Sequence, residues 1–130
     1  MFRISPKTHG VLDYVVGGAI ALLPHALKCS KKTTRFLQAA GYGAGVYSML
    51  TDYERGVLKV LPMEGHLALD ALSGAGLITV AMLLNHETPP NRAILAGIGA
   101  FEITVASFTS TEAYTAGEAP TAVERIAEYV

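Results

Sequence analysis

Two similar stretches of sequence, His9-Gly10-Val11-Leu12-Asp13 and His66-Leu67-Ala68-Leu69-Asp70, decide how this chain is expected to fold. Each has a proline a few residues before it and an apolar run rich in glycine and alanine after it. A shift of 57 positions superimposes the first stretch on the second, and a shift of 58 aligns the segments that follow. The sequence therefore predicts two copies of one helical hairpin, repeat 1 over about residues 5–55 and repeat 2 over about residues 62–112.

Cap residues and prolines divide the chain into four predicted helices. Ser5-Pro6 is typical of a helix start, because the serine hydroxyl accepts from free amides of the first turn and proline suits the first helical position. A capping-box pattern from Thr121 to Glu124 predicts a short last helix within a polar tail, residues 113–130. The four main helices are expected over about residues 6–27, 34–51, 63–84 and 91–109, with a loop at residues 85–90.

These elements predict an all-α fold in a single domain, residues 1–130: a four-helix bundle of two parallel helical-hairpin repeats plus a short C-terminal helix. The composition favours a transmembrane bundle, because the chain is 51% hydrophobic and only 16% charged, against about 25% charged residues in a typical soluble domain. No polar face can be drawn on residues 14–27 or 71–84. We therefore expect a multi-pass protein of the bacterial cytoplasmic (inner) membrane, with the lipid bilayer as a partner.

A soluble four-helix bundle is the alternative to a membrane bundle. Every long apolar run is interrupted by a polar side chain, and runs of about 10–14 residues suit buried helices of soluble proteins. The interrupting residues are Asp13, Gln38, Asp70 and Glu102.

Charge and cysteine content exclude several classes of function. The formal net charge is −1, so the chain has no basic field that would hold nucleic acid. The single cysteine, Cys29, has no partner for a disulfide and no neighbouring zinc-binding motif. The sequence contains no nucleophile elbow, phosphate-cradling loop or HExxH motif, and we expect no enzymatic activity.

Three segments, residues 4–14, 50–54 and 61–70, resemble a group of small bacterial membrane proteins related to the SPW-repeat family. The family repeats read Ser-Pro-x-x-His-Gly-x-Leu-Asp-Tyr and close with Ser-Pro-Trp. The resemblance covers about residues 4–109 and implies four membrane helices in two repeats, with no established activity. This chain has no tryptophan, and Leu23-Pro24-His25 stands where the first repeat would close.

The repeated histidines and aspartates are the candidate site. His9 with Asp13 and His66 with Asp70 are each four residues apart, so each pair lies on one helix face. If the repeats are related by a pseudo-twofold axis, the two pairs converge. Two histidines and two carboxylates suit a divalent transition metal or a short proton relay. The same arrangement also suits a purely structural cross-link, so we expect no cofactor, with a divalent metal as the first alternative and a haem held by two histidines as the second.

Glu102 is the other candidate residue, because it lies in the middle of an apolar run where an unpaired charge is costly. It is either a functional acid or a tolerated packing residue. For the chain as a whole we expect a non-catalytic structural or interaction protein that self-associates as a homo-oligomer or binds a membrane protein partner. Its small-residue faces, such as Gly41 and Gly45, would form the contact. The alternatives are a metal- or proton-handling protein that uses the His/Asp pairs, and a soluble binding module.

Overall fold

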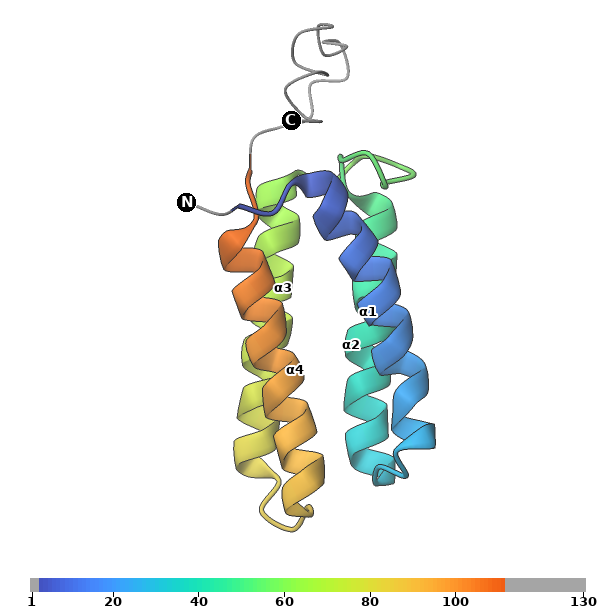
Figure 1. Ribbon diagram of the computed structural model, residues 1–130, viewed down its shortest axis with the longest axis vertical. Helices are drawn as coiled ribbons and strands as arrows, with labels where there is room; N and C mark the ends of the chain where they lie inside the picture. Colours follow the sequence, from blue (N-terminus) through green and yellow to red (C-terminus); the bar gives the residue numbers. More distant parts are fainter. Residues whose placement is uncertain (1–2, 112–130) are drawn as a thin grey trace, which may run out of the picture.

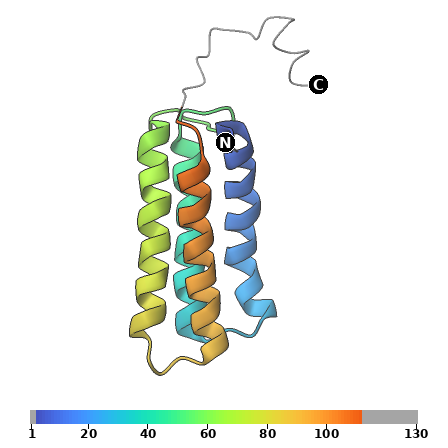
Figure 2. The ribbon, with the colours of Figure 1, turned by 60° about the vertical axis from the view of Figure 1, so that its left-hand side comes forward.

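The computed structural model describes residues 3–111, which form four helices and no named strand. The first hairpin consists of α1, Pro6–Ala26, and α2, Lys31–Leu50; the second consists of α3, Met63–Leu83, and α4, Pro89–Phe108. All four run roughly along the long axis of the molecule (Figures 1 and 2). Both α1 and α3 begin at the end that is uppermost in Figure 1, so the hairpins point the same way. The all-α, four-helix prediction is confirmed, whereas the predicted last helix lies outside the described residues.

Two helices begin earlier than the sequence predicts. α2 begins at Lys31 because the Ser30 side chain caps it, accepting a hydrogen bond of 3.1 Å from the backbone N–H of Thr33. α4 begins at Pro89, ahead of Asn91, because prolines suit the first turn of a helix, where a missing N–H costs nothing. The double proline, which we interpreted as loop, therefore opens the helix.

Each hairpin is held together by a close contact between two glycines. A methyl group added at Gly41 of α2 would lie 2.5 Å from the carbonyl oxygen of Gly17 in α1. In the second hairpin, a methyl group at Gly74 would lie 2.5 Å from the carbonyl oxygen of Gly99. Only glycine permits helix backbones to approach this closely. By contrast, Gly45, which we expected to share this contact, faces open space.

Backbone hydrogen bonds tie the helix ends together at the upper end of the molecule. The N–H of Ile4 donates to the carbonyl of Phe108 at 2.8 Å, and the N–H of Ser110 donates to the carbonyl of Ile4 at 2.9 Å. Similarly, the N–H of Asp52 donates to the carbonyl of Leu61 at 2.8 Å, which joins the end of α2 to the start of α3. These ties fix the first turns of α1 and α3 next to the last turns of α4 and α2.

The buried apolar cluster lies further down the bundle and joins both hairpins. It consists of Leu37 of α2, Leu77 and Ala81 of α3, and Leu95 of α4, all nearly or fully inaccessible to solvent. α1 contributes no side chain to this cluster. The cluster therefore attaches the second hairpin to α2, while α1 and α4 leave room for a cavity between them.

The predicted multi-pass location in the bacterial cytoplasmic membrane is wrong. Within residues 3–111, only α3 has the length and the apolar composition that crossing a bilayer requires, with a mean hydropathy of 1.5. In the 18-residue segment of α3 that meets this criterion, only 28% is buried inside the protein. A multi-pass protein needs several such helices. The other three fall short because polar residues interrupt them: Lys7, His9 and Asp13 in α1, Lys31, Lys32, Arg35 and Gln38 in α2, and Asn91, Arg92 and Glu102 in α4.

Candidate metal centre

The four predicted site residues meet at the upper end of the bundle. His9 and Asp13 project from α1, and His66 and Asp70 project from α3. Each residue offers one ligand atom, and these four atoms all lie within 4.8 Å of one another. Both histidines are fully buried. The two helices therefore bring together side chains that are far apart in the sequence.

The distances between the ligand atoms are short and similar. His9 Nε2 lies 3.1 Å from Asp13 Oδ1 and 2.9 Å from Asp70 Oδ2. His66 Nε2 lies 3.1 Å from Asp13 Oδ2 and 3.3 Å from Asp70 Oδ2, and the two Nε2 atoms are 3.1 Å apart. Ligand atoms bound tetrahedrally at about 2.0–2.1 Å from an ion are separated by roughly 3.3 Å. The two imidazole nitrogens therefore lie near this spacing from each other and from both carboxylates.

A threonine hydroxyl binds the outer nitrogen of each imidazole. His9 Nδ1 lies 2.7 Å from Thr109 Oγ1, and His66 Nδ1 lies 2.7 Å from Thr51 Oγ1. Each hydroxyl donates its one proton to a backbone carbonyl four residues earlier, Thr109 to Val105 and Thr51 to Tyr47. The threonines therefore accept hydrogen bonds from the histidines, and both Nδ1 atoms carry protons. In a neutral imidazole this leaves the Nε2 lone pair directed into the cluster, as a metal ligand requires.

Hydroxyl groups of α2 and the following loop orient the carboxylates. Tyr47 donates a hydrogen bond to Asp70 Oδ1, and Ser48 donates to Asp13 Oδ2 at 3.0 Å. Tyr53 also donates to Asp13 Oδ2, at 3.1 Å. The ring of Tyr53 occupies the space that a side chain at Gly10 would fill. Each carboxylate is consequently held by a hydroxyl as well as by the imidazoles.

The electrostatics of the cluster favour paired charges. Burial alone would lower the pKa of His9. The hydrogen bonds and the negative charges of Asp13 and Asp70 have a larger effect than burial, and together they raise this pKa to about 9. The pKa of His66 is raised for the same reasons. Burial would raise the pKa of Asp13 and Asp70, yet hydrogen bonds from the imidazoles lower both values, that of Asp70 to about 2. Without a metal, the two carboxylates therefore favour protonation of the imidazoles that they contact.

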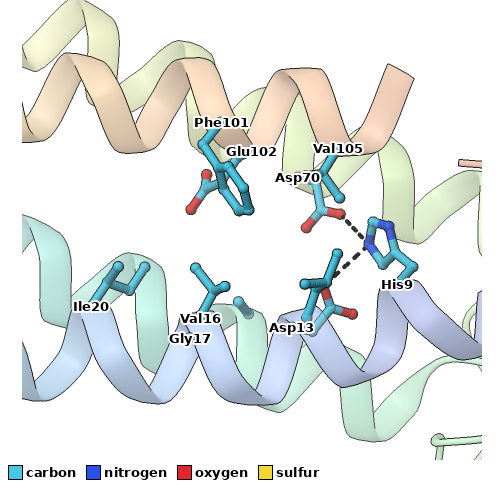
Figure 3. A pocket seen from close by; sticks show the side chains of 11 residues that line it. His9, Asp13, Val16, Gly17, Ile20, Asp70, Phe101, Glu102 and Val105 are labelled. Carbon is cyan, nitrogen blue, oxygen red and sulfur yellow. Dashed lines mark hydrogen bonds and ion pairs between the residues drawn. The ribbon is translucent and has the colours of Figure 1, made fainter. Parts of the chain in front are cut away.

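Glu102 lies outside this cluster but shares a cavity with it. The cavity has a volume of about 30 Å³ and lies between α1 and α4 (Figure 3). In Figure 3, Glu102 faces the gap from α4, and His9, Asp13 and Asp70 close one end. Burial raises the pKa of Glu102 to about 7, despite an opposing hydrogen bond with Ser73. Glu102 is thus a neighbour of the cluster and not one of its four grouped ligand atoms.

The sequence analysis missed the hydroxyl groups that surround the cluster. Thr51 and Thr109, which bind the histidines, were not among the predicted site residues. Tyr47, which binds Asp70, was not among them either. A signal was available, because the shift of 58 that aligns the second helices pairs Thr51 with Thr109.

The other two histidines lie far from the cluster. His25 and His86 lie at the opposite end of the bundle and are exposed. His25 Nε2 lies 3.0 Å from the side-chain nitrogen of Gln38. Neither histidine belongs to a group of metal-binding side chains within the described residues. They serve below as controls.

Comparison with known protein families, with curated proteins and with solved structures gives no match to this chain. The resemblance to the SPW-repeat group therefore stays a prediction, and the geometry of the cluster carries the functional argument.

Proposed function

We propose that this protein binds one divalent transition-metal ion between its hairpins, with His9, Asp13, His66 and Asp70 as ligands. The observation that carries this proposal is the convergence of four suitable donor atoms within 4.8 Å. Two imidazole nitrogens and two carboxylate oxygens suit zinc and its neighbours in the first transition row. The hydroxyls behind both imidazoles match the outer hydrogen bonds that orient metal-binding histidines.

The charge balance of the cluster also favours a metal over a purely structural cross-link. If both imidazoles were protonated on Nε2, two N–H groups would face each other at 3.1 Å, and like charges at this distance repel. A divalent ion replaces the two Nε2 protons without changing the net charge. Both carboxylates then keep a positive partner, and the contact between the two Nε2 atoms becomes a contact between two ligands of one ion.

We also propose that the two hairpins are parallel repeats whose axis passes through the cluster. Three matched relationships support this proposal: the glycine contact within each hairpin, the hydroxyl behind each imidazole, and the His/Asp pair at the start of α1 and of α3. Each repeat would then supply half of the ligands. A metal at this position would join the repeats next to the backbone hydrogen bonds between Ile4 and the end of α4.

Metal analysis of the full chain tests the proposed function. The protein is purified without an affinity histidine tag, loaded with Zn²⁺, freed of excess ion and analysed for zinc. The wild type and the control His25→Ala/His86→Ala are expected to retain about one ion per chain, and His9→Ala/His66→Ala is expected to retain almost none. Equal zinc in both double variants would overturn the proposal.

A second candidate function is the self-associating or partner-binding module that the sequence predicts. It is supported by large apolar side chains that the described fold leaves exposed, such as Leu22, Leu72 and Leu83, exposed by 68%, 68% and 72%. Sedimentation of the purified chain tests it. A monomer at all concentrations, with no protein partner retained, would contradict this function.

A further inference from the structure

A cavity lies between α1 and α4, next to the four proposed ligands, and the proposed metal ion would not fill it. Its volume of about 30 Å³ is enough for about two water molecules, since one water needs roughly 10–15 Å³. The cavity begins at the cluster and continues along the facing surfaces of the two helices (Figure 3). Apart from the polar residues already described, its walls are apolar, formed by Leu12, Val16, Ile20, Phe101 and Val105, with Gly17 and Ala44.

The cavity reaches one side of the cluster only. His9, Asp13 and Asp70 line it, and His66 does not. An ion held by the four ligands would therefore have His66 on its far side and the cavity on its near side. Zinc and cobalt(II) expand from four to five ligands when a small molecule has access, so this side offers a further coordination position.

Glu102 lines the same cavity and is the second group that a molecule at this position can contact. Its Oε2 is the one side-chain nitrogen or oxygen within residues 3–111 that is buried and has no hydrogen-bond partner. A buried polar atom without a partner is costly, and such atoms are commonly paired with a water or a ligand. The carboxyl lines the same cavity as the cluster, so one small molecule can contact both.

We propose that the cavity is an exchangeable coordination position of the metal centre, occupied by a water molecule that donates a hydrogen bond to Glu102 and displaced by small inorganic anions. This inference rests on the proposed function, because it needs the ion to be bound. In the exchange, the bond between metal and water oxygen breaks, the anion's donor atom binds the metal, and the water leaves.

The probes are Co²⁺, whose visible ligand-field spectrum reports coordination number, and azide, a linear anion of three atoms. Azide is expected to change the spectrum of the Co²⁺-loaded wild type in a saturable way. Val16→Phe fills the cavity and should weaken azide binding by at least about tenfold while the protein still takes up Co²⁺. Val15→Phe, at the neighbouring exposed position, is the control and should bind azide as the wild type does.

Glu102→Gln gives an independent readout. On the alkaline side of its pKa, the Glu102 carboxylate repels the incoming anion and stabilises the water that must leave. The amide does not repel azide, so this variant should bind azide about tenfold more tightly at unchanged Co²⁺ content. A merely structural glutamate would leave azide affinity unchanged.

The outcomes separate the two proposals. If Co²⁺ binds with its expected spectrum but azide has no effect, the exchangeable position is overturned and the metal site stands. Equal azide affinities for Val16→Phe and Val15→Phe, or for Glu102→Gln and the wild type, would also overturn it. If the wild type takes up no Co²⁺ at all, the proposed function fails before azide is added, and this inference fails with it.

Discussion

His9 Nε2 and His66 Nε2 lie 3.1 Å apart, although the two residues belong to different hairpins and are separated by 57 positions in the sequence. Neither ring is free to turn away, because its Nδ1 is bonded to a threonine at 2.7 Å. The bundle thus directs two nitrogen atoms of the same kind at one point and surrounds that point with carboxylates.

The first prediction concerns the hydroxyl behind His9. Thr109→Val keeps the shape of the side chain but leaves the Nδ1–H of His9 buried without an acceptor. We expect metal affinity to fall by about 10–100-fold and the free energy of unfolding to fall by about 1–3 kcal/mol. Competition with a coloured chelator measures the affinity, and denaturant unfolding measures the stability.

Thr104→Val is the matched control for this experiment. Thr104 lies in α4, just before the end of the helix that Thr109 caps, and it also donates to the carbonyl four residues earlier, but it is exposed and bonds no histidine. Its replacement should leave metal affinity unchanged. Equal losses of affinity in both variants would show that the threonine acts on the helix and not on the imidazole.

The second prediction concerns removal of the metal. Because the ligands come from both hairpins, the unfolded chain has no preformed site, and bound metal should stabilise the fold. At a free metal concentration about 100 times Kd, the gain is about 2.7 kcal/mol. We therefore expect a chelator to lower the melting temperature of the loaded wild type and to leave that of His9→Ala/His66→Ala unchanged. A wild-type melting temperature indifferent to both zinc and chelator contradicts the proposed site.

The third prediction concerns the glycine contact of the first hairpin. Gly41→Ala places a methyl group 2.5 Å from the Gly17 carbonyl oxygen, so the helices must separate, at a cost of about 1–3 kcal/mol. Gly45→Ala, one turn further along α2, meets nothing within 4 Å and should stabilise the helix by up to about 1 kcal/mol. Chemical denaturation of both variants measures the difference, and a Gly41→Ala protein as stable as Gly45→Ala would contradict this packing.

The fourth prediction is a pH dependence due to Glu102. Burial raises its pKa from 4.5 to about 7, so between these values the folded protein binds a proton that the unfolded chain has lost. The contribution of Glu102 to the free energy of unfolding is then fully present below pH 4.5 and is lost as the pH rises to about 7. Glu102→Gln cannot titrate, so in chelated protein its free energy of unfolding should improve relative to wild type across this window.

Glu64→Gln, at an exposed position near the start of α3, is the control for that pH series. Its unfolding free energy should follow the wild-type curve across the same window. If the Glu102→Gln curve also runs parallel to the wild-type curve, the carboxyl of Glu102 is solvated in the folded protein and does not retain its proton.

Local sequence signals were sufficient to predict the helices. Where a helix starts depends on prolines and capping serines within a few residues. The spacing of four residues places each histidine and its aspartate on one face of a helix. The errors at the starts of α2 and α4 are also local. Ser30 caps α2 ahead of the start that we predicted, and Pro89 begins a helix that we expected it to precede.

The surroundings of the site were less predictable, because they depend on helix packing. Composition does not reveal that Thr51 and Thr109 lie behind the imidazoles, since this depends on where α2 and α4 end relative to α1 and α3. The composition of the whole chain overestimated its membrane character. The overall hydrophobic fraction does not show that polar residues interrupt three of the four helices, and in α1 two of these residues, His9 and Asp13, belong to the site.

The backbone hydrogen bonds between Ile4 and the residues at the end of α4 have a topological consequence. The chain leaves the cluster, passes through four helices and returns to its starting point, so residues 4–110 form an almost closed ring. A circular permutant that joins these positions and opens in the turn at Lys28–Ser30 would follow the same path in space. Its ligands would then be synthesised in the order His66, Asp70, His9, Asp13. The centre depends on which helices are neighbours and not on which is made first.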